Sequence, residues 1–223
     1  MNATNMMFDV FVRLIVLFTA MPVHECAHGY IASRLGDNTA RYQGRLTLNP
    51  FVHLDPLGSV LLVFTGFGWA KPVQVNPRNF KHPRRDMALS SLAGPVSNVI
   101  LALIVMVVFK LCLGLGYTSA MRSGNNALYT ILQMLSIMIS VNLSLAVFNF
   151  LPIPPLDGSK IFGAILPEKY YFFMMQYERY VFIALILLLY TGILSTPLRF
   201  LTGLLYSLLD IITMPVSWLV GII

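Results

Sequence analysis

The chain has few charged residues for its length. Only 11% of its 223 residues are Asp, Glu, Lys or Arg, whereas 57% are hydrophobic, and the mean hydropathy is +0.75. Soluble domains carry about 25% charged residues, so this composition excludes an ordinary soluble protein. The sequence therefore predicts a protein embedded in a lipid bilayer.

Cysteine is also scarce, and the sequence has no internal repeat, low-complexity tract or flexible linker. The two cysteines, Cys26 and Cys112, are predicted at opposite ends of different membrane spans, so the Cα separation of at most about 7 Å that a disulfide needs is excluded. We expect free thiols, and we expect Cys26 to pack rather than to bind metal. Without repeats or linkers, residues 1–223 are predicted to form a single membrane-embedded domain.

Apolar segments of about 20 residues, the length that crosses a bilayer, recur along the chain. They lie near residues 8–33, 88–113, 127–150 and 178–195, and a further one covers 198–222. The first resembles the apolar part of a signal peptide, but no cleavage motif of small residues follows it, so we interpret it as a retained helix. The predicted fold is an all-α polytopic membrane protein with about 4–6 transmembrane helices.

Residues 35–87 are too polar and too rich in Gly and Pro to cross the membrane. They contain the apolar run Leu57–Ala70, which is short, β-branched and aromatic, and therefore favours a re-entrant or β-like element over a spanning helix. Irregular backbone at membrane depth must be covered by protein or face a wet cavity. We therefore expect a cavity beside this segment.

Positive charge is concentrated in the same part of the chain. Eight of the fifteen Lys and Arg residues lie between Arg34 and Asp86, whereas the loop near residues 114–126 carries only Arg122. The positive-inside bias places residues 34–86 in the cytoplasm and the N-terminus outside. The basic residues form neither a compact run nor a helix face, so the net charge of +6 does not indicate a nucleic-acid partner.

The pattern H-E-x-x-H occurs at His24-Glu25-Cys26-Ala27-His28. Residues four apart lie on one face of a helix, so both imidazoles can bind one metal ion, while Glu25 projects about 100° away, where it can contact a water molecule without binding the metal. Ionisable groups inside an apolar span are costly unless they are paired or bound to metal, which favours a zinc site over a chance string.

A catalytic zinc ion has three protein ligands, so a third ligand is expected. Asp157 is the best of the few acidic candidates, because three prolines between Asn149 and Asp157 end the third predicted span and leave an unwound segment. The first span runs from the outside toward the cytoplasm and reaches His24 after about 24 Å, and the third span runs in the same direction and ends before Asp157. His24 and Asp157 would therefore both lie toward the cytoplasmic side of a multi-pass cell-membrane protein. The alternative for Pro-Leu-Asp-Gly is an exposed turn.

Two patterns downstream accompany the H-E-x-x-H motif. Asn149-x-x-Pro152-x-x-x-x-Asp157-Gly158 contains the candidate third ligand, and Gly94-x-x-x-Asn98 lies in the second long span. Together the three patterns resemble the site-2 protease family of intramembrane zinc metalloproteases over about residues 8–165. The resemblance covers a compact form without a PDZ or CBS domain.

This resemblance implies an enzyme that hydrolyses peptide bonds within or near the transmembrane segments of protein substrates. It implies one Zn²⁺ ion with three ligands: His24, His28 and Asp157. Glu25 would be the general base and acid, and Asn98 and Asn149 would line the cleft. Asn149 is a candidate oxyanion donor, or equally a side chain that satisfies the carbonyls of a broken helix.

The alternative is a zinc-binding membrane protein without protease activity, either a transporter or an inactive scaffold. A transporter would carry ionisable groups along a path and often inverted repeats, and neither is found. A scaffold has little use for Glu25, which need not bind metal. The partners expected are the lipid bilayer and a transmembrane substrate, which could pair as a strand with Leu57–Asn76; a regulatory partner is unknown.

Overall fold

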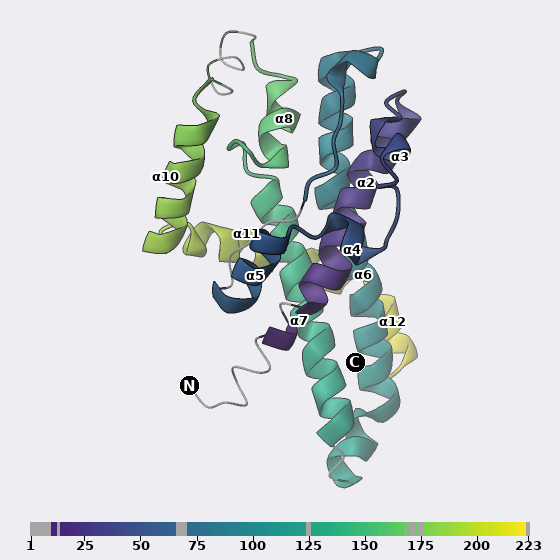
Figure 1. Cartoon of the computed structure of the whole chain (residues 1–223). Helices are drawn as coiled ribbons and strands as arrows, with labels where there is room; N and C mark the ends of the chain where they lie inside the picture. Colours follow the sequence, from purple (N-terminus) through teal and green to yellow (C-terminus); the bar gives the residue numbers. More distant parts are fainter. Residues whose placement is uncertain are drawn as a thin grey trace.

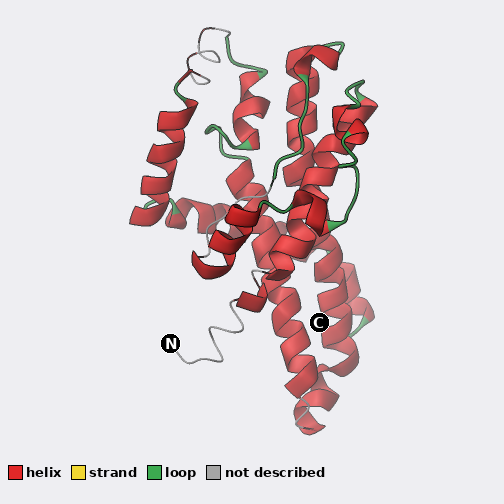
Figure 2. Ribbon diagram, in the orientation of Figure 1, coloured by secondary structure: helices red, strands yellow, loops and turns green. Residues whose placement is uncertain are grey.

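The computed structural model describes residues 10–12, 14–65, 71–123, 126–167, 169, 173 and 176–221. These residues form a bundle of helices of very different lengths (Figure 1). No β-strand occurs among them, and loops join the helices (Figure 2). The prediction of an all-α protein is confirmed.

Two long helices form the centre of the bundle. Helix α6 (Pro83–Ser123) packs along α7 (Asn126–Asn149), and apolar side chains from both form the core together with Leu209. The fully buried members from α6 and α7 include Ala102, Met106, Ile139 and Leu143. Because lipid is as apolar as these side chains, close packing rather than exclusion of water holds such helices together.

A third helical stretch packs against α6. Residues 10–12 and 14–15 are helical, the π-helical turn η1 (Val16–Ala20) follows, and α2 (Met21–Arg34) completes the stretch. Pro22 cannot donate a backbone hydrogen bond and its ring crowds the preceding turn, which accounts for the wider turn at η1. The stretch runs antiparallel to α6, because His28 lies beside Ser90 and His24 beside Gly94.

Three stretches in the described part of the chain are long and apolar enough to cross a membrane: Val10–Arg34, Pro83–Gly114 and Ala127–Asn149. They correspond to the first three predicted spans. Helices α10 (Glu178–Thr191) and α11 (Ser195–Ile212) are long and apolar enough only as a pair, and they meet at 84°. The described residues therefore hold three spans, or four if the bent pair crosses once.

The last predicted span, 198–222, is not continuous. Helix α11 ends at Ile212, and α12 (Met214–Leu219) begins anew with Pro215 in its first turn. Lys110 of α6 forms an ion pair with Asp210 of α11. The buried ammonium of Lys110 lies 2.8 Å from Asp210 Oδ1. This ion pair between two hydrophobic helices was not predicted from the sequence.

Of the two alternatives for Leu57–Ala70, the β-like element is wrong for the described part of the segment, and the re-entrant element stays a prediction. Residues Pro56–Thr65 form helix α5, and residues 66–70 lie outside the described residues. Asp55 starts this helix, because its side chain accepts a hydrogen bond from the Gly58 N–H at 2.7 Å while Pro56 occupies the first helical position. These two start signals outweigh the β-branched residues that favour a strand.

Short elements connect α2 to α6 on the surface. They are α3 (Thr39–Tyr42), α4 (Pro50–His53), α5 and the 3₁₀ turn η2 (Pro77–Asn79). Between α5 and η2, the segment Lys71–Asn76 has no regular secondary structure. It passes beside α2 toward the start of α6 (Figure 1).

Candidate metal centre

His24, His28 and Asp157 come together although 133 positions separate His24 from Asp157. The Nε2 atoms of His24 and His28 are 3.0 Å apart. Asp157 Oδ2 lies 3.1 Å from His24 Nε2 and 3.2 Å from His28 Nε2. All three side chains are buried, so the structure gathers the predicted ligands into one compact group.

The triangle of ligand atoms has the size of a zinc site. With Zn–N and Zn–O bonds of about 2.0–2.1 Å, neighbouring ligand atoms of a tetrahedral site lie roughly 3.3 Å apart. The observed separations of 3.0, 3.1 and 3.2 Å are close to that value. Two imidazoles and one carboxylate are also ligands that zinc prefers, so the donor set fits one Zn²⁺ ion with a fourth position left open.

Helix α6 orients His28 through its backbone. Nδ1 of His28 donates to the Ser90 carbonyl at 2.8 Å, and Ser90 Oγ donates to the His28 carbonyl at 3.0 Å. A proton on Nδ1 leaves Nε2 of the neutral ring with a free lone pair toward the ligand group. Nδ1 of His24 is buried without a hydrogen-bond partner in the described part of the chain.

Gly94 of α6 leaves room for both imidazoles. A Cβ atom at this position would lie 2.6 Å from His24 Cε1, and closer still to ring atoms of His28. Any side chain at residue 94 would therefore displace the rings. The first residue of the Gly94-x-x-x-Asn98 pattern thus has a steric reason to be glycine.

The loop after α7 brings Asp157 to the histidines. Helix α7 ends at Asn149, the prolines that follow cannot continue it, and α8 (Asp157–Gly163) begins at the candidate ligand Asp157. Gly158 packs so closely on the carbonyl oxygens of Phe150 and Leu151 that a Cβ atom would collide with backbone.

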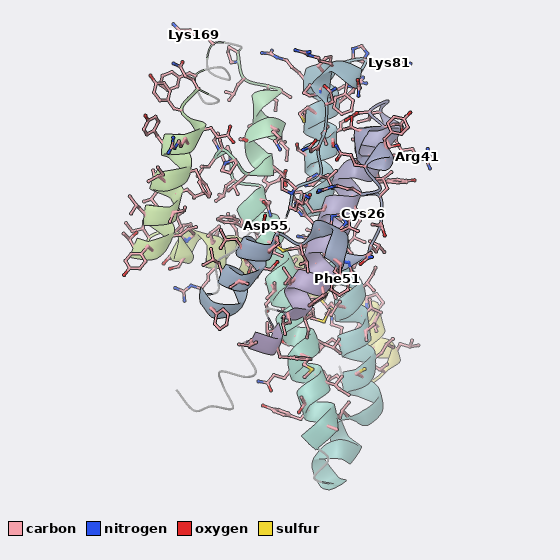
Figure 3. The ribbon with its side chains drawn as sticks, in the orientation of Figure 1. Cys26, Arg41, Phe51, Asp55, Lys81 and Lys169 are labelled. Carbon is pink, nitrogen blue, oxygen red and sulfur yellow. The ribbon has the colours of Figure 1, made fainter. Side chains whose placement is uncertain are left out.

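Glu25 lies next to the triangle without joining it. Its Oε2 accepts a hydrogen bond from the Val73 N–H at 2.7 Å. The carboxylate lines a cavity of about 280 Å³ together with the three candidate ligands and residues of the Lys71–Asn76 segment. Cys26, the next residue of α2, has a free thiol, as predicted (Figure 3). A cavity therefore borders both the ligand group and a candidate proton-transfer group.

Comparison with known proteins identifies the family. Residues 12–190 match Peptidase family M50, more than half of the chain. The chain belongs to peptidase family M50. The resemblance to site-2 proteases is thereby confirmed, and the protein is a zinc metalloprotease with membrane-spanning helices.

Three relatives carry names that agree with this family. The chain is 46% identical over 182 residues to "Putative zinc metalloprotease YwhC" of Bacillus subtilis, which covers 81% of this chain and 79% of the relative. It is 29% identical over 151 residues to "Putative zinc metalloprotease Rip2" of Mycolicibacterium smegmatis, covering 66% and 52%. It is 27% identical over 159 residues to "Zinc metalloprotease MJ0392" of Methanocaldococcus jannaschii, covering 71% and 35%. No solved structure matches the chain.

The two asparagines singled out from the M50 patterns have different surroundings. Asn149 lines the cavity, but its Nδ2 donates to the Leu145 carbonyl at 3.0 Å, so the amide stabilises the end of α7. Asn98 is fully buried and is not one of the residues that line this cavity. Neither amide atom of Asn98 has a hydrogen-bond partner among the residues that the structure describes.

Lys160 is a cavity residue of this M50 protein that the sequence did not reveal. It lies one helical turn after Asp157, and its Nζ is 4.0 Å from Asp157 Oδ1. Residues three apart on a helix share a face, so this proximity could have been inferred once α8 was known to begin at Asp157.

Proposed function

We propose that this M50 protease hydrolyses peptide bonds within or near the transmembrane segments of membrane proteins. The observation that carries the proposal is the buried group of His24, His28 and Asp157, which lies beside Glu25 between helices long and apolar enough to span a bilayer. Such a site is accessible to a segment that lies in the membrane. The substrate class is therefore a protein with membrane-spanning helices.

In this proposal the three ligands hold one zinc ion, and Glu25 transfers protons. Zinc, when bound, acts as a Lewis acid that lowers the pKa of a water molecule and polarises a carbonyl oxygen. Glu25 takes the proton of the attacking water and later delivers it to the leaving amine. Its place on the cavity wall, outside the ligand triangle, suits this role because the carboxylate stays free to exchange a proton.

We place the active site toward the cytoplasmic side of the membrane. Lys81, Arg41 and Lys169 lie toward one end of the bundle although they are distant in sequence (Figure 3). Helix α2 ends and α6 begins at the same end (Figure 1). The positive-inside bias assigns this end to the cytoplasm. His28, near the end of α2, and Ser90, near the start of α6, lie toward the same end.

A transmembrane substrate must be unwound before it is cut, because its peptide bonds are held in helical hydrogen bonds. The hypothesis that it pairs as a strand with this protease now applies to Lys71–Asn76, since Pro56–Thr65 is helical. Residues 72, 73 and 75 of the segment line the cavity. Backbone pairing there would hold an extended substrate beside Glu25.

Cleavage of transmembrane reporter proteins by the purified, lipid-reconstituted protein tests the proposed function. We expect cleavage by the wild type, loss of cleavage in Glu25→Gln, and the same zinc content in both, because Glu25 is not a ligand. Equal cleavage by Glu25→Gln would contradict its role as general base. Cleavage of soluble peptides alone would contradict the proposed substrate class.

A further inference from the structure

Glu25 has a hydrogen-bond partner that no motif marks. Its carboxylate oxygen Oε2 accepts from the backbone N–H of Val73 at 2.7 Å. This is the only hydrogen bond to the Glu25 carboxylate within the described ranges, so Oε1 remains without a hydrogen bond there, and Glu25 lines the cavity. The two carboxylate oxygens of Glu25 therefore differ: Oε2 accepts a hydrogen bond from the backbone, and Oε1 accepts none in the described part of the chain.

The segment is fixed just before Val73 by contacts with the surface loop. Arg45 Nη1 donates to the carbonyls of Lys71 at 3.2 Å and of Pro72 at 3.0 Å. The Lys71 N–H donates to the His53 carbonyl at 2.8 Å, and His53 is itself buried. Both backbone groups of Lys71 and the carbonyl of Pro72 are therefore held in place.

The segment is fixed again just after Val73 by a buried carboxylate. Asp37 accepts hydrogen bonds from the Asn76 N–H and from Asn79 Nδ2, each at 2.7 Å. Asp37 is 0% exposed and lies three residues after the end of α2. The same short stretch that carries the H-E-x-x-H pattern is thus joined to the segment at two carboxylates, Glu25 and Asp37.

Gly29 allows the segment to approach α2 closely. A Cβ atom at Gly29 would lie 3.0 Å from Ala40 Cβ and 3.2 Å from Val73 Cγ1. Glu25 and Gly29 are four residues apart, so they lie on one face of the helix. The segment therefore packs on the helix face that presents Glu25.

From these contacts we propose that the Val73 N–H is a positioning group for Glu25, and that Arg45 and Asp37 are positioning residues that hold Val73 in place. The proposal rests on the proposed role of Glu25 as general base. A glutamate side chain has several rotamers, and proton transfer requires the one within hydrogen-bond reach of the water. The Val73 N–H selects one orientation before substrate binds, which is the preorganisation that catalysis requires.

The matched variants at this site are Val73→Pro, Val73→Ala and Val75→Pro. Val73→Pro removes the N–H, Val73→Ala removes most of the side chain but keeps the N–H, and Val75→Pro alters the segment where no hydrogen bond to its N–H is found in the described residues. With a transmembrane reporter, we expect kcat of Val73→Pro to fall about 10- to 100-fold, the size of a lost hydrogen bond to a charged group. KM and zinc content should stay unchanged, and Val73→Ala and Val75→Pro should each lose less kcat than Val73→Pro, because both variants keep the Val73 N–H.

Arg45 gives a second measurement that does not alter the segment itself. Arg45→Ala should lower kcat less than Val73→Pro, because the Asp37 contacts persist. Arg45→Lys should restore part of the loss, since an ammonium group can still donate to the carbonyls of Lys71 and Pro72. If Arg45 had only a structural role, Arg45→Ala would change zinc content or protein yield. Arg45→Lys would then not restore kcat specifically.

The outcomes distinguish this proposal from the proposed function. Full activity of Val73→Pro beside an inactive Glu25→Gln would overturn the positioning role and leave the role of Glu25 intact. A loss confined to KM would also overturn it and would favour pairing of the substrate with the segment. Full activity of Glu25→Gln would overturn the role of Glu25 and the positioning proposal together.

Discussion

Gly94 contributes to the metal centre by having no side chain. We predict that Gly94→Ala lowers zinc affinity about 10- to 100-fold, the range for changes that misplace metal ligands, because the added methyl group would displace the imidazoles of His24 and His28. Zinc bound per chain after dialysis against graded chelator concentrations measures this. Gly203→Ala in α11 is the control, since nothing lies within 4 Å of a Cβ atom there. Equal zinc retention by the two variants would contradict the account.

The residues of the ligand group were predictable for a physical reason. The spacing of His24 and His28 is set by helix geometry, and an acidic residue after three prolines is rare in so apolar a chain. Val73 holds Glu25 through its backbone N–H, and Ser90 orients the His28 ring through its backbone carbonyl, so the type of side chain at these positions gives no signal for these contacts. Asp37 could not be recognised either, because its partners depend on the path of a segment without periodicity.

At the scale of elements, Asp37 connects the end of α2 to the segment that covers the cavity. Burial opposes its ionisation, but hydrogen bonds from Thr39, Asn79 and Asn76 outweigh this and hold the pKa of Asp37 below its ordinary value. A carboxyl group with a lowered pKa in the folded protein stabilises it at pH values above the unfolded pKa of about 3.9. That contribution is lost as the pH falls through the lower folded value.

We therefore predict that Asp37→Asn lowers the thermal unfolding midpoint at pH 7, and that the difference from the wild type shrinks in acid as Asp37 of the wild type becomes protonated. Midpoints measured between pH 7 and about pH 3 test this. Asp55→Asn is the matched control, because Asn caps a helix about as well as Asp does. A difference that is the same at every pH would show that Asp37 stabilises the protein through its shape alone.

The helices themselves were predicted unevenly. The first three spans were placed close to their observed ends because each is a long, uninterrupted apolar run. The bend between the C-terminal helices was not predicted: Gly192 ends α10 with a φ of 74°, and the chain turns by 84° before α11. Hydropathy reports how apolar a segment is and carries no information about its direction. Helix α5 was not predicted, because its β-branched and aromatic residues are typical of a strand, whereas the side chain of Asp55 stabilises the start of a helix.

At the scale of the whole molecule, the site is assembled by three alternating spans. Helices α2 and α7 run toward the end of the bundle at which α6 begins, so His24 and Asp157 meet at one depth. The sequence predicted this common depth, because the distribution of Lys and Arg indicates the direction of each span. The assignment of this end to the cytoplasm is a proposal that needs an experiment.

Single cysteines at the two ends of the bundle test the orientation in a background without Cys26 and Cys112. We expect Lys81→Cys and Lys169→Cys to react with a membrane-impermeant thiol reagent only after cells are permeabilised, because positive charge collects at the cytoplasmic end. Tyr129→Cys, at the exposed start of α7, should react in intact cells. The reverse labelling pattern would contradict the orientation.

The central claim is that one zinc ion is bound by His24, His28 and Asp157, and X-ray absorption at the zinc edge of the purified protein tests it most directly. With these three ligands, we expect only nitrogen and oxygen atoms around the zinc ion, at about 2.0–2.2 Å, with scattering from two imidazole rings. We also expect that Cys26→Ser leaves this spectrum unchanged. A sulfur atom at about 2.3 Å that disappears in Cys26→Ser would contradict the account, because Cys26 would then be a ligand in place of one of the three.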